Sequence, residues 1–196
     1  MRDITKLSLT IVQAGTVAAL FLAASGIAAA PQQSSYVMES NSMLPLLRKD
    51  DRAKCVASSG APAPVALGDL IVYRHPKREG HWVKMVAGLA GDTVEMRGDL
   101  LYINGQAVPK RRARDFEIEP GKKVPRFEET LPNGVTTFVL DRDPAGFLDF
   151  SSPSKVPPGH VFVIGSNRDD SIDSRVEKDH GLVPVGNIVC RIEVRK

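Results

Sequence analysis

The sequence predicts a mainly β domain of antiparallel strands that follows a single apolar N-terminal segment. Short runs of β-branched and aromatic residues alternate with turns rich in glycine, proline and asparagine. No stretch beyond residue 30 has the 3.6-residue periodicity of an amphipathic helix. The chain has 196 residues, of which 42% are hydrophobic and 25% charged, and this suffices for one globular domain with its own core.

The N-terminal segment is long enough to cross a bilayer. Residues 7–30 contain no charged side chain and follow Arg2 and Lys6. A helix rising ~1.5 Å per residue would span a ~30 Å hydrocarbon core, and the preceding positive charges favour a cytoplasmic N-terminus. A cleaved signal peptide is the alternative, because Ala28-Ala29-Ala30 has the small residues of a cleavage site. We expect residues 1–34 to form an anchor and spacer.

Residues 35–196 are expected to form the folded domain, and its first half contains four strand-like runs. These are residues 70–73, 82–87, 93–96 and 100–103. The second and third runs are separated by a turn signal, Gly91-Asp92, and the last run enters Asn104-Gly105, a strong signal for a type I′ hairpin.

Residues 110–158 differ in composition from the rest, because they are charged and rich in proline and glycine. We expect a small inserted β subdomain with a hairpin or two of its own, including a strand at 136–140. The basic run at its beginning, residues 110–114, is expected to form a solvated loop. The alternative is that this run contacts acidic lipid headgroups. The main sheet should resume with a buried strand at 160–165 and close with an outer strand at 186–194.

Charge and cysteine content narrow the classes of partner. The formal net charge of +3 is too small to indicate a nucleic-acid partner. The four histidines stand apart in the sequence and there is no CxxC, so we expect no metal site and no cofactor. Cys55 and Cys190 either form one disulfide in an oxidising compartment or remain two buried thiols, and the sequence leaves both open.

Two segments carry residues suited to nucleophilic catalysis. Ser42 lies about a dozen residues beyond the apolar segment, and Lys84 lies in an apolar strand-like run. A serine hydroxyl needs a neighbouring base, and a neutral lysine can be that base. Strand alternation puts Trp82 and Val86 on the same face as Lys84, where burial would lower the pKa of the amine from ~10.4. A fall of about three units would cost roughly 4 kcal/mol of stability at neutral pH.

Taken singly, each signal has an ordinary alternative. Lys84 could extend its amine to solvent from an edge strand, and the serine-rich turn could be an ordinary polar turn. Residues 165–175 could form a polar loop or a calcium-binding loop, although they lack the central glycine and the terminal glutamate of an EF-hand loop.

Together and in this order, the three segments resemble the type I signal peptidase family. The family's serine box reads approximately S-G-S-M-x-P-T-L, and this chain has Ser40-Asn41-Ser42-Met43-Leu44-Pro45-Leu46-Leu47. The lysine box, approximately K-R-V-V-G-L-P-G-D, is matched by residues 84–92. The late box, G-D-N-R-D-N-S-x-D-S-R, is matched by residues 165–175 with Ser166 and Asp170 as departures. The resemblance runs from about Ser35 to the C-terminus and is loosest across residues 110–158.

The resemblance implies a Ser/Lys dyad. It makes Ser42 the nucleophile and Lys84 the general base. The Ser40 hydroxyl and the Ser42 backbone N–H would form the oxyanion hole, as two donors aimed at the developing charge. Ser171 would hydrogen-bond the Lys84 amine and orient it.

Three further residues acquire supporting roles by the same resemblance. Asp173 and Arg175 would form an ion pair that holds the late box against the site, and Met43 would help to build the substrate cleft. Two departures lie near the dyad. Asn41 replaces a glycine, so that the turn must tolerate a side chain, and Met85 replaces an arginine, which removes a positive charge beside Lys84.

The function implied is that of a membrane-anchored endopeptidase that removes signal peptides from exported preproteins. It would act at the outer face of the cytoplasmic (inner) membrane, with signal peptides and membrane lipid as partners and without metal or cofactor. One alternative is a pilin-processing peptidase of a conjugation or secretion system. Others are a catalytically inactive, membrane-tethered β domain that binds exported chains, and a self-cleaving Ser-Lys repressor, which the lack of a helical DNA-binding domain disfavours.

Overall fold

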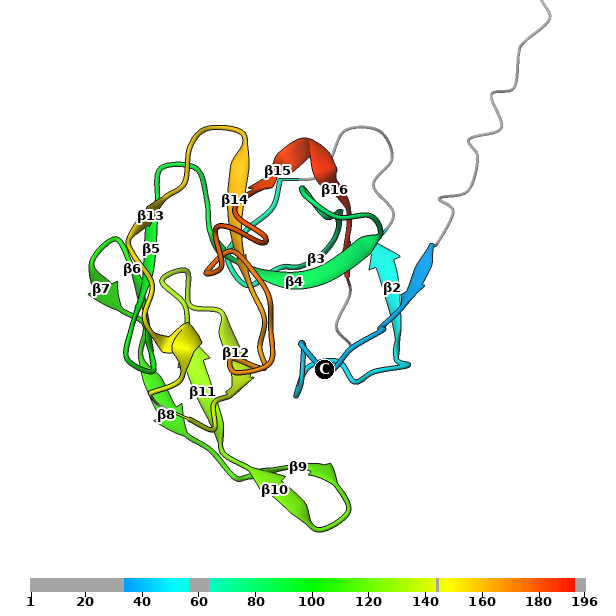
Figure 1. Cartoon of the computed structure of the whole chain (residues 1–196), viewed down its shortest axis with the longest axis vertical. Coiled ribbons are helices and arrows are strands. Elements are labelled where there is room, and N and C mark those ends of the chain that lie inside the picture. Colours follow the sequence, from blue (N-terminus) through cyan, green and yellow to red (C-terminus); the bar gives the residue numbers. More distant parts are fainter. Residues whose placement is uncertain (1–33, 57–63, 144, 193–196) are drawn as a thin grey trace, which may run out of the picture. The chain divides into compact units, whose positions relative to one another are not determined.

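The computed structural model describes residues 34–56, 64–143 and 145–192, which form antiparallel β-sheets (Figure 1). Within these ranges the helical segments are two 3-10 turns, Phe147–Asp149 (η1) and Val185–Asn187 (η2). The mainly β, antiparallel class is therefore confirmed. No helix in the described ranges has the length and apolar character needed to cross a membrane. The anchor expected at residues 1–34 lies outside them, apart from Ser34.

A seven-stranded sheet forms the centre of the domain, with the order β1-β2-β16-β3-β4-β14-β15. All strand pairings within it are antiparallel. The strands expected at 70–73, 82–87 and 160–165 are confirmed. The bounds are Ser35–Val37 (β1), Arg52–Val56 (β2), Leu70–Arg74 (β3), His81–Gly88 (β4), His160–Ile164 (β14), Val183–Pro184 (β15) and Ile188–Ile192 (β16).

Strand β4 contributes to two apolar clusters, one from each of its faces. Val83, Met85 and Ala87 pack in the larger cluster, whereas Trp82 and Val86 pack in the other. This is the division that strand alternation predicted.

A four-stranded sheet with the order β13-β5-β6-β7 follows β4 along the chain. Asn104 and Gly105 both have positive φ, 53° and 76°, as a type I′ turn requires, and the hairpin predicted from them is confirmed. The strands expected at 93–96 and 100–103 are also present. The bounds are Thr93–Arg97 (β5), Leu100–Ile103 (β6), Gln106–Ala107 (β7) and Ser154–Lys155 (β13).

Residues 110–158 contain the hairpins expected of them. One three-stranded sheet has the order β12-β11-β8, and β9 and β10 form a separate hairpin. The strand expected at 136–140 is confirmed. The bounds are Lys110–Arg112 (β8), Phe116–Glu119 (β9), Lys122–Val124 (β10), Arg126–Thr130 (β11) and Thr136–Leu140 (β12). The treatment of 110–158 as an inserted subdomain, and the boundary between residues 34 and 35, stay predictions.

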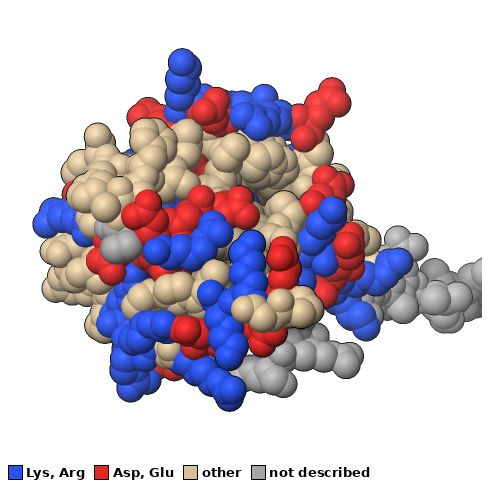
Figure 2. Space-filling model, turned by 60° about the horizontal axis from the view of Figure 1, so that its bottom comes forward, with Lys and Arg blue, Asp and Glu red and all other residues tan. Residues whose placement is uncertain are grey.

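The basic run at 110–114 is not a loop throughout, because its first three residues form β8. The side chain of Lys110 is only 3% exposed, and its amine lies 2.5 Å from an oxygen of Asp141 and 3.1 Å from one of Asp99. Two distant carboxylates thus compensate a charge that the local sequence marks as solvated. Figure 2 shows basic and acidic side chains interspersed over the face that it presents.

The expectation of an outer strand near the C-terminus is wrong, because β16 lies between β2 and β3. The register shifts between Ile188, which pairs with Tyr73, and Cys190, which pairs with Val72. Val189 is the extra residue of this irregularity and is 37% exposed. The alternation in the sequence therefore reflects a bulged interior strand.

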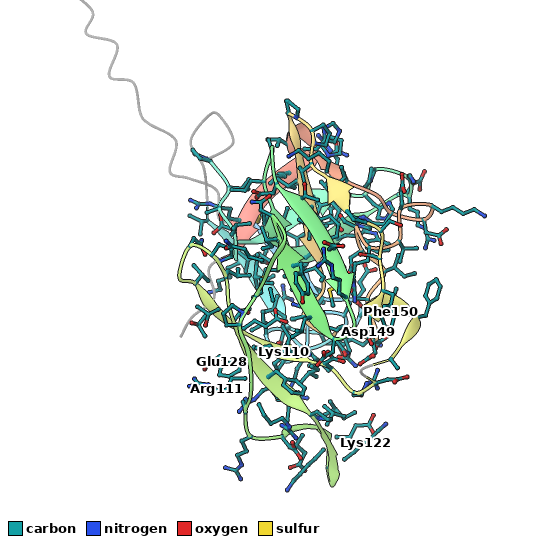
Figure 3. All side chains as sticks on the ribbon, turned by 90° about the vertical axis from the view of Figure 1, so that its left-hand side faces the viewer. Lys110, Arg111, Lys122, Glu128, Asp149 and Phe150 are labelled. Carbon is teal, nitrogen blue, oxygen red and sulfur yellow. A yellow bond between two sulfur atoms is a disulfide. The ribbon has the colours of Figure 1, made fainter. Side chains whose placement is uncertain are left out.

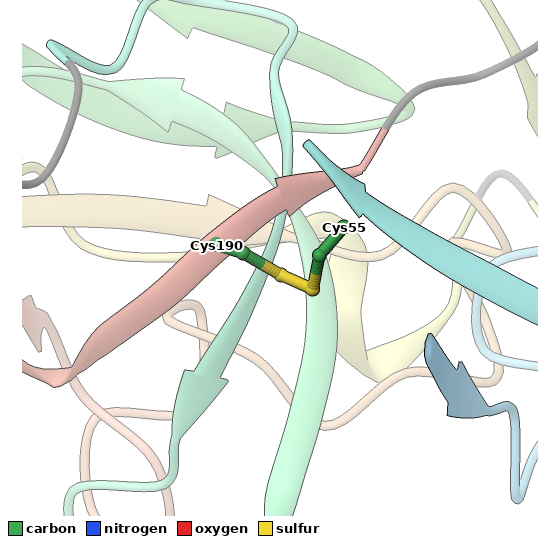
Figure 4. Close-up of a disulfide and its surroundings, with 2 residues drawn as sticks. All are labelled: Cys55 and Cys190. Carbon is green, nitrogen blue, oxygen red and sulfur yellow. A yellow bond between two sulfur atoms is a disulfide. The ribbon is translucent and has the colours of Figure 1, made fainter. Parts of the chain in front are cut away.

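A disulfide between Cys55 of β2 and Cys190 of β16 resolves the alternatives that the sequence left open (Figure 4). The two Cα atoms are 5.6 Å apart on neighbouring strands, and 135 positions separate the residues along the chain. The bond fastens β16, the last strand of the described chain, to the neighbouring strand β2.

Replacing both cysteines with serine should lower the free energy of unfolding by about 2–5 kcal/mol, because a bond that closes so long a loop restricts the unfolded chain. Urea unfolding of the oxidised parent and of the double variant measures this difference. Reductant should destabilise the parent and leave the variant unchanged. Equal midpoints for the oxidised parent and the variant would contradict the prediction.

Candidate active site

A cleft of about 1120 Å³ opens beside β4. Its lining comes from Val37 and the segment after β1, from residues 81–84 of β4, from residues 142–143 and 146–148, from Val176 and Asp179, and from residues 169–172. The last group belongs to residues 165–175, which we call the late loop. Ser40, Ser42, Lys84 and Ser171 all line this cleft, so four positions selected from three separate segments of the sequence meet there.

Ser42 and Lys84 are in direct contact. Lys84 Nζ lies 2.7 Å from Ser42 Oγ and donates a hydrogen bond to it. Ser42 is 7% exposed and Lys84 is 3% exposed. Burial lowers the pKa of Lys84 to about 8, the charges of Asp173 and Asp170 oppose this fall, and that of Arg175 adds to it. A substantial fraction of the amine is therefore neutral at mildly alkaline pH.

The end of β14 leaves room for the cleft. This strand pairs with β4 only from Met85 onward, and its last residue, Ile164, is the partner of Met85. Among the described strands, residues 81–84 of β4 pair with β3 alone, so their other edge is free. At Gly165 the chain turns into the late loop. A Cβ there would lie 2.0 Å from Ser171 Oγ and 2.8 Å from the carbonyl oxygen of Ser42, so this close approach requires glycine.

The hydroxyl of Ser40 lies beside the nucleophile turn. Ser40 Oγ donates to Ser42 Oγ at 3.1 Å and accepts from the Ser42 backbone N–H at 3.4 Å. Both groups expected to stabilise an oxyanion are thus near Ser42 Oγ. In this arrangement they are hydrogen-bonded with Ser42 itself and with each other, so a substrate carbonyl would have to replace these contacts.

Ser171 lies in the cleft, but its hydrogen bond differs from the expected one. Its hydroxyl donates to Asp173 Oδ2 at 2.8 Å. Among the described residues, the side-chain hydrogen bond of Lys84 goes to Ser42. A buried carboxylate is a stronger acceptor than an amine that is itself donating, which explains the choice. Ser171 therefore contacts Asp173, whose charge raises the pKa of Lys84, and not the amine itself.

The Asp173–Arg175 ion pair is present and almost fully buried, with side chains 0% and 1% exposed. Arg175 Nε and Nη2 each lie 2.9 Å from one oxygen of the carboxylate. Burial alone would raise the pKa of Asp173, but the charge and hydrogen bonds of Arg175, with the Gly165 N–H, lower it to about 2. A compensated carboxylate thus stands near the Lys84 amine.

Met43 does not line the cleft, contrary to the role expected for it. Its side chain is fully buried in the larger apolar cluster, and its carbonyl accepts hydrogen bonds from the N–H groups of Leu46 and Leu47 in a tight turn. This turn directs the apolar side chain into the core. Met43 therefore supports the nucleophile turn from the core side.

Asn41 fits its turn without a left-handed conformation. The non-glycine residues with positive φ in the described ranges are Asp50 and Asn104. Asn41 Oδ1 instead accepts the backbone N–H of Lys49 at 3.0 Å, and its carbonyl accepts from Asn167 Nδ2 at 3.0 Å. The Asn41 side chain thus closes the turn, and its backbone carbonyl, which any residue would supply, links the turn to the late loop.

Sequence reasoning missed a buried ion pair between the late loop and β11. Arg168 is 0% exposed, and its two terminal nitrogens lie 3.0 Å and 2.6 Å from the two oxygens of Glu129, which is also 0% exposed. The presence of Arg168 in the late box was the one feature of the sequence that pointed to this ion pair. Nothing in the sequence around Glu129 marks it as the partner.

Two histidines that stand apart in the sequence meet beside Trp82. The ring centroids of His75 and His180 are 4.6 Å apart, and that of His75 lies 4.2 Å from the Trp82 ring. Burial lowers the pKa of both, that of His75 to about 4, and the neighbouring His180 lowers it further. Both rings are therefore neutral at pH 7. The Lys84 amine lies 5.5 Å from the centroid of the Trp82 ring, so Trp82 lies near both the neutral pair and the amine.

Comparisons with known proteins indicate one family. The model of a family described as "Signal peptidase, peptidase S26" matches residues 8–195. Signal peptidase I of Rickettsia bellii (strain OSU 85-389) is 35% identical over 133 residues, which cover 64% of this chain and 45% of that protein. Signal peptidase I of Rickettsia canadensis (strain McKiel) is 35% identical over 136 residues, covering 64% and 49%. The chain thus spans about half the length of these curated relatives.

Among solved structures, a signal peptidase I from Enterococcus faecalis V583 aligns with a TM-score of 0.41 and 24% identity. The alignment covers 68% of this chain and 100% of that one.

Replacing Arg168 with methionine should lower the free energy of unfolding by about 3–5 kcal/mol, because it leaves the Glu129 carboxylate buried and unpaired. Urea unfolding measures the loss. The double variant Arg168→Met, Glu129→Met should recover part of it, since no uncompensated charge remains. A double variant less stable than Arg168→Met would contradict this account.

Proposed function

Because the chain belongs to the signal peptidase family, peptidase S26, we propose that it is a serine endopeptidase that removes signal peptides from exported preproteins. The observation that carries the proposal is the 2.7 Å contact between Ser42 Oγ and a Lys84 amine that is 3% exposed. Contact supplies the path for a proton, and burial supplies the lowered pKa that a lysine base needs.

In the proposed reaction, neutral Lys84 accepts the Ser42 hydroxyl proton as Oγ attacks the scissile carbonyl. The Ser40 hydroxyl and the Ser42 N–H then stabilise the oxyanion of the tetrahedral intermediate. Protonated Lys84 gives its proton to the leaving amine, and an acyl-Ser42 ester remains. Lys84 next accepts a proton from the water that attacks the ester, and it returns this proton to Ser42 Oγ as the bond between Oγ and the acyl group breaks and the second product leaves. Each step uses side chains and backbone of this chain.

The preprotein would bind in extended form along the free edge of residues 81–84 of β4. Val37, Glu39 and Ser40 line the cleft as well, which supports a peptide lying between that edge and the segment after β1. An edge of unpaired backbone groups suits an extended chain, because main-chain hydrogen bonds bind it whatever its sequence. By family resemblance, small side chains would occupy the first and third positions before the cut.

The proposed placement is on the outer face of the cytoplasmic (inner) membrane. Residues 1–34 would provide the anchor and spacer, and residues 35–196 the peptidase domain, with 110–158 inserted in it. Ser42 follows residue 30 by twelve positions. That short tether would hold the nucleophile near the bilayer surface, where a signal peptide's cleavage site emerges.

A dedicated pilin-processing peptidase remains the second candidate, with the same dyad and a narrower substrate range. Asn41 favours it, because its side chain accepts the Lys49 N–H, a contact that the glycine of the family's serine box could not make. Complementation of a strain depleted of its general signal peptidase separates the two candidates. Growth supports the general enzyme, and failure to grow with a stably expressed, active chain supports the dedicated one.

Replacement of Ser42 or Lys84 with alanine should reduce cleavage of a preprotein by about 10³-fold or more, since each removes one half of the dyad. The assay uses the purified full-length chain in detergent and follows product by mass. Ser154→Ala and Lys155→Ala, in β13 outside the cleft, are matched controls and should keep parental activity. Parental rates in either dyad variant would refute the assignment, and an inactive parent would favour the binding domain.

The value of kcat/KM should rise with pH through about 8, because the active form has a neutral Lys84 and deprotonation increases its fraction. Initial rates between pH 5 and 10 measure this rising limb of the kcat/KM–pH profile. A profile flat over that range would exclude a lysine base.

Asp170→Asn should move the rising limb of the kcat/KM–pH profile to lower pH, because the Asp170 carboxylate raises the pKa of Lys84 and asparagine carries no charge. Asparagine is also the residue that the family's late box has at this position. Asp179→Asn makes the same change elsewhere in the lining of the cleft and should leave the limb in place. Equal shifts in both variants would point to a general change of surface charge.

A further inference from the structure

Three carboxylates meet beside the cleft, away from Ser42 and Lys84. Asp141 follows β12, Asp149 ends η1 and Asp169 belongs to the late loop. One oxygen of each lies within 4.8 Å of one oxygen of each of the other two. Asp141 is 4% exposed and Asp149 is 1% exposed, while Asp169 reaches the lining of the cleft. Figure 3 labels Asp149 together with Lys110, the cation that contacts Asp141.

Each of the two buried carboxylates has one oxygen without a hydrogen-bond partner in the described chain. Asp141 Oδ2 contacts the Lys110 amine at 2.5 Å, and Asp149 Oδ2 accepts the Gly146 N–H at 2.8 Å. The remaining atoms, Asp141 Oδ1 and Asp149 Oδ1, are buried and unpaired. Carboxylate oxygens in such a position are costly, because they have lost water and gained no donor.

The cations around the cluster do not compensate all three charges. Lys110 pairs with Asp141, and Arg142 Nε lies 3.7 Å from Asp169 Oδ2. Arg175, whose charge also acts on Asp149, pairs with the Asp173 carboxylate through two nitrogens. Within the described ranges Asp149 has no salt bridge.

We propose that Asp141, Asp149 and Asp169 bind a divalent metal ion, and that the ion is Ca²⁺. Oxygen-only ligands select hard cations such as Ca²⁺ and Mg²⁺. Ca²⁺ accepts carboxylates and water in a flexible geometry, whereas Mg²⁺ demands a near-ideal octahedron and gives up its water reluctantly, so three carboxylates from separate segments suit Ca²⁺ better. Water can complete the coordination from the cleft, which Asp169 borders.

The bound ion would join the 141–149 segment to the late loop. These two parts already meet where Arg175 Nη1 donates to the carbonyl of Leu148 at 3.3 Å and where Asp169 Oδ2 accepts the Arg142 N–H at 2.8 Å. The ion has a structural role: it adds a third link at the base of the loop that holds Asp173 near Lys84. This inference does not depend on the proposed reaction.

The test uses the full-length chain in detergent at pH 7.5, stripped with EDTA and dialysed. CaCl₂ at 5 mM should raise Tm by about 3–5 °C relative to NaCl of equal ionic strength, because an ion that binds only the folded chain stabilises it. Calorimetric titration with CaCl₂ should give about one site per chain, and MgCl₂ should produce a smaller shift in Tm.

Asp149→Asn should abolish both the Tm shift and the calorimetric signal, whereas Asp143→Asn, in the same segment and outside the cluster, should retain both. Asp169→Asn, at the exposed side of the cluster, provides a second variant if Asp149→Asn does not fold. No Ca²⁺-dependent shift in the parent, or an equal shift in the Asp149 and Asp169 variants, would overturn the proposal. A parent that ignores Ca²⁺ and is stabilised by Asp149→Asn would show that Asp141 and Asp149 share a proton instead.

Discussion

Removal of water from the Lys84 amine is the constraint on which the rest of the site depends. Burial lowers the pKa of this amine to about 8 in the folded chain, against an ordinary value of 10.5. Below pH 8 the folded chain therefore holds a buried ammonium group, at a cost of roughly 3 kcal/mol that declines as the pH rises from about 8 towards 10.5. The apolar clusters on the two faces of β4 offset this cost. Strand β4 can contribute to both clusters because it lies between β3 and β14 in the sheet. The end of β14 at Ile164 then gives a buried group access to the cleft.

Desolvation lowers the pKa only if nearby charges do not restore the proton, and the late loop controls those charges. Asp173 would hold a proton on Lys84, but Arg175, Ser171 and the Gly165 N–H share its charge. His75 and His180 add no positive charge at neutral pH, because burial lowers the pKa of both. The loop thus supplies a carboxylate that positions groups around the amine while its charge is largely compensated.

Local patterns predicted the features that depend on neighbours in the sequence. Alternation along residues 82–87 gave the two faces of β4, and Asn104-Gly105 gave the hairpin turn, because each depends on conformation within a few residues. The dyad followed from the order of three boxes. Local patterns did not predict the features that depend on distant partners. The burial of Lys110 requires Asp141, and the pairing of Arg168 requires Glu129. Ser171 could meet either of two groups in one pocket, and only the folded geometry selects Asp173 over Lys84.

Those distant partners give residues 110–158 a part in positioning the site. The Leu140 N–H donates to the Ser166 carbonyl at 2.8 Å, and the Arg168 N–H donates to the Leu140 carbonyl at 2.9 Å, so the end of β12 brackets the start of the late loop. Arg168 then reaches Glu129 on β11. The main sheet fixes Lys84, whereas the β11–β12 hairpin fixes the loop that sets the charge around it. A shift between these two parts would change the distance from Asp173 to the amine without altering either dyad residue. The hairpin therefore helps to position the loop whose charges act on the pKa of Lys84, through the Leu140 backbone contacts and through the Arg168–Glu129 ion pair.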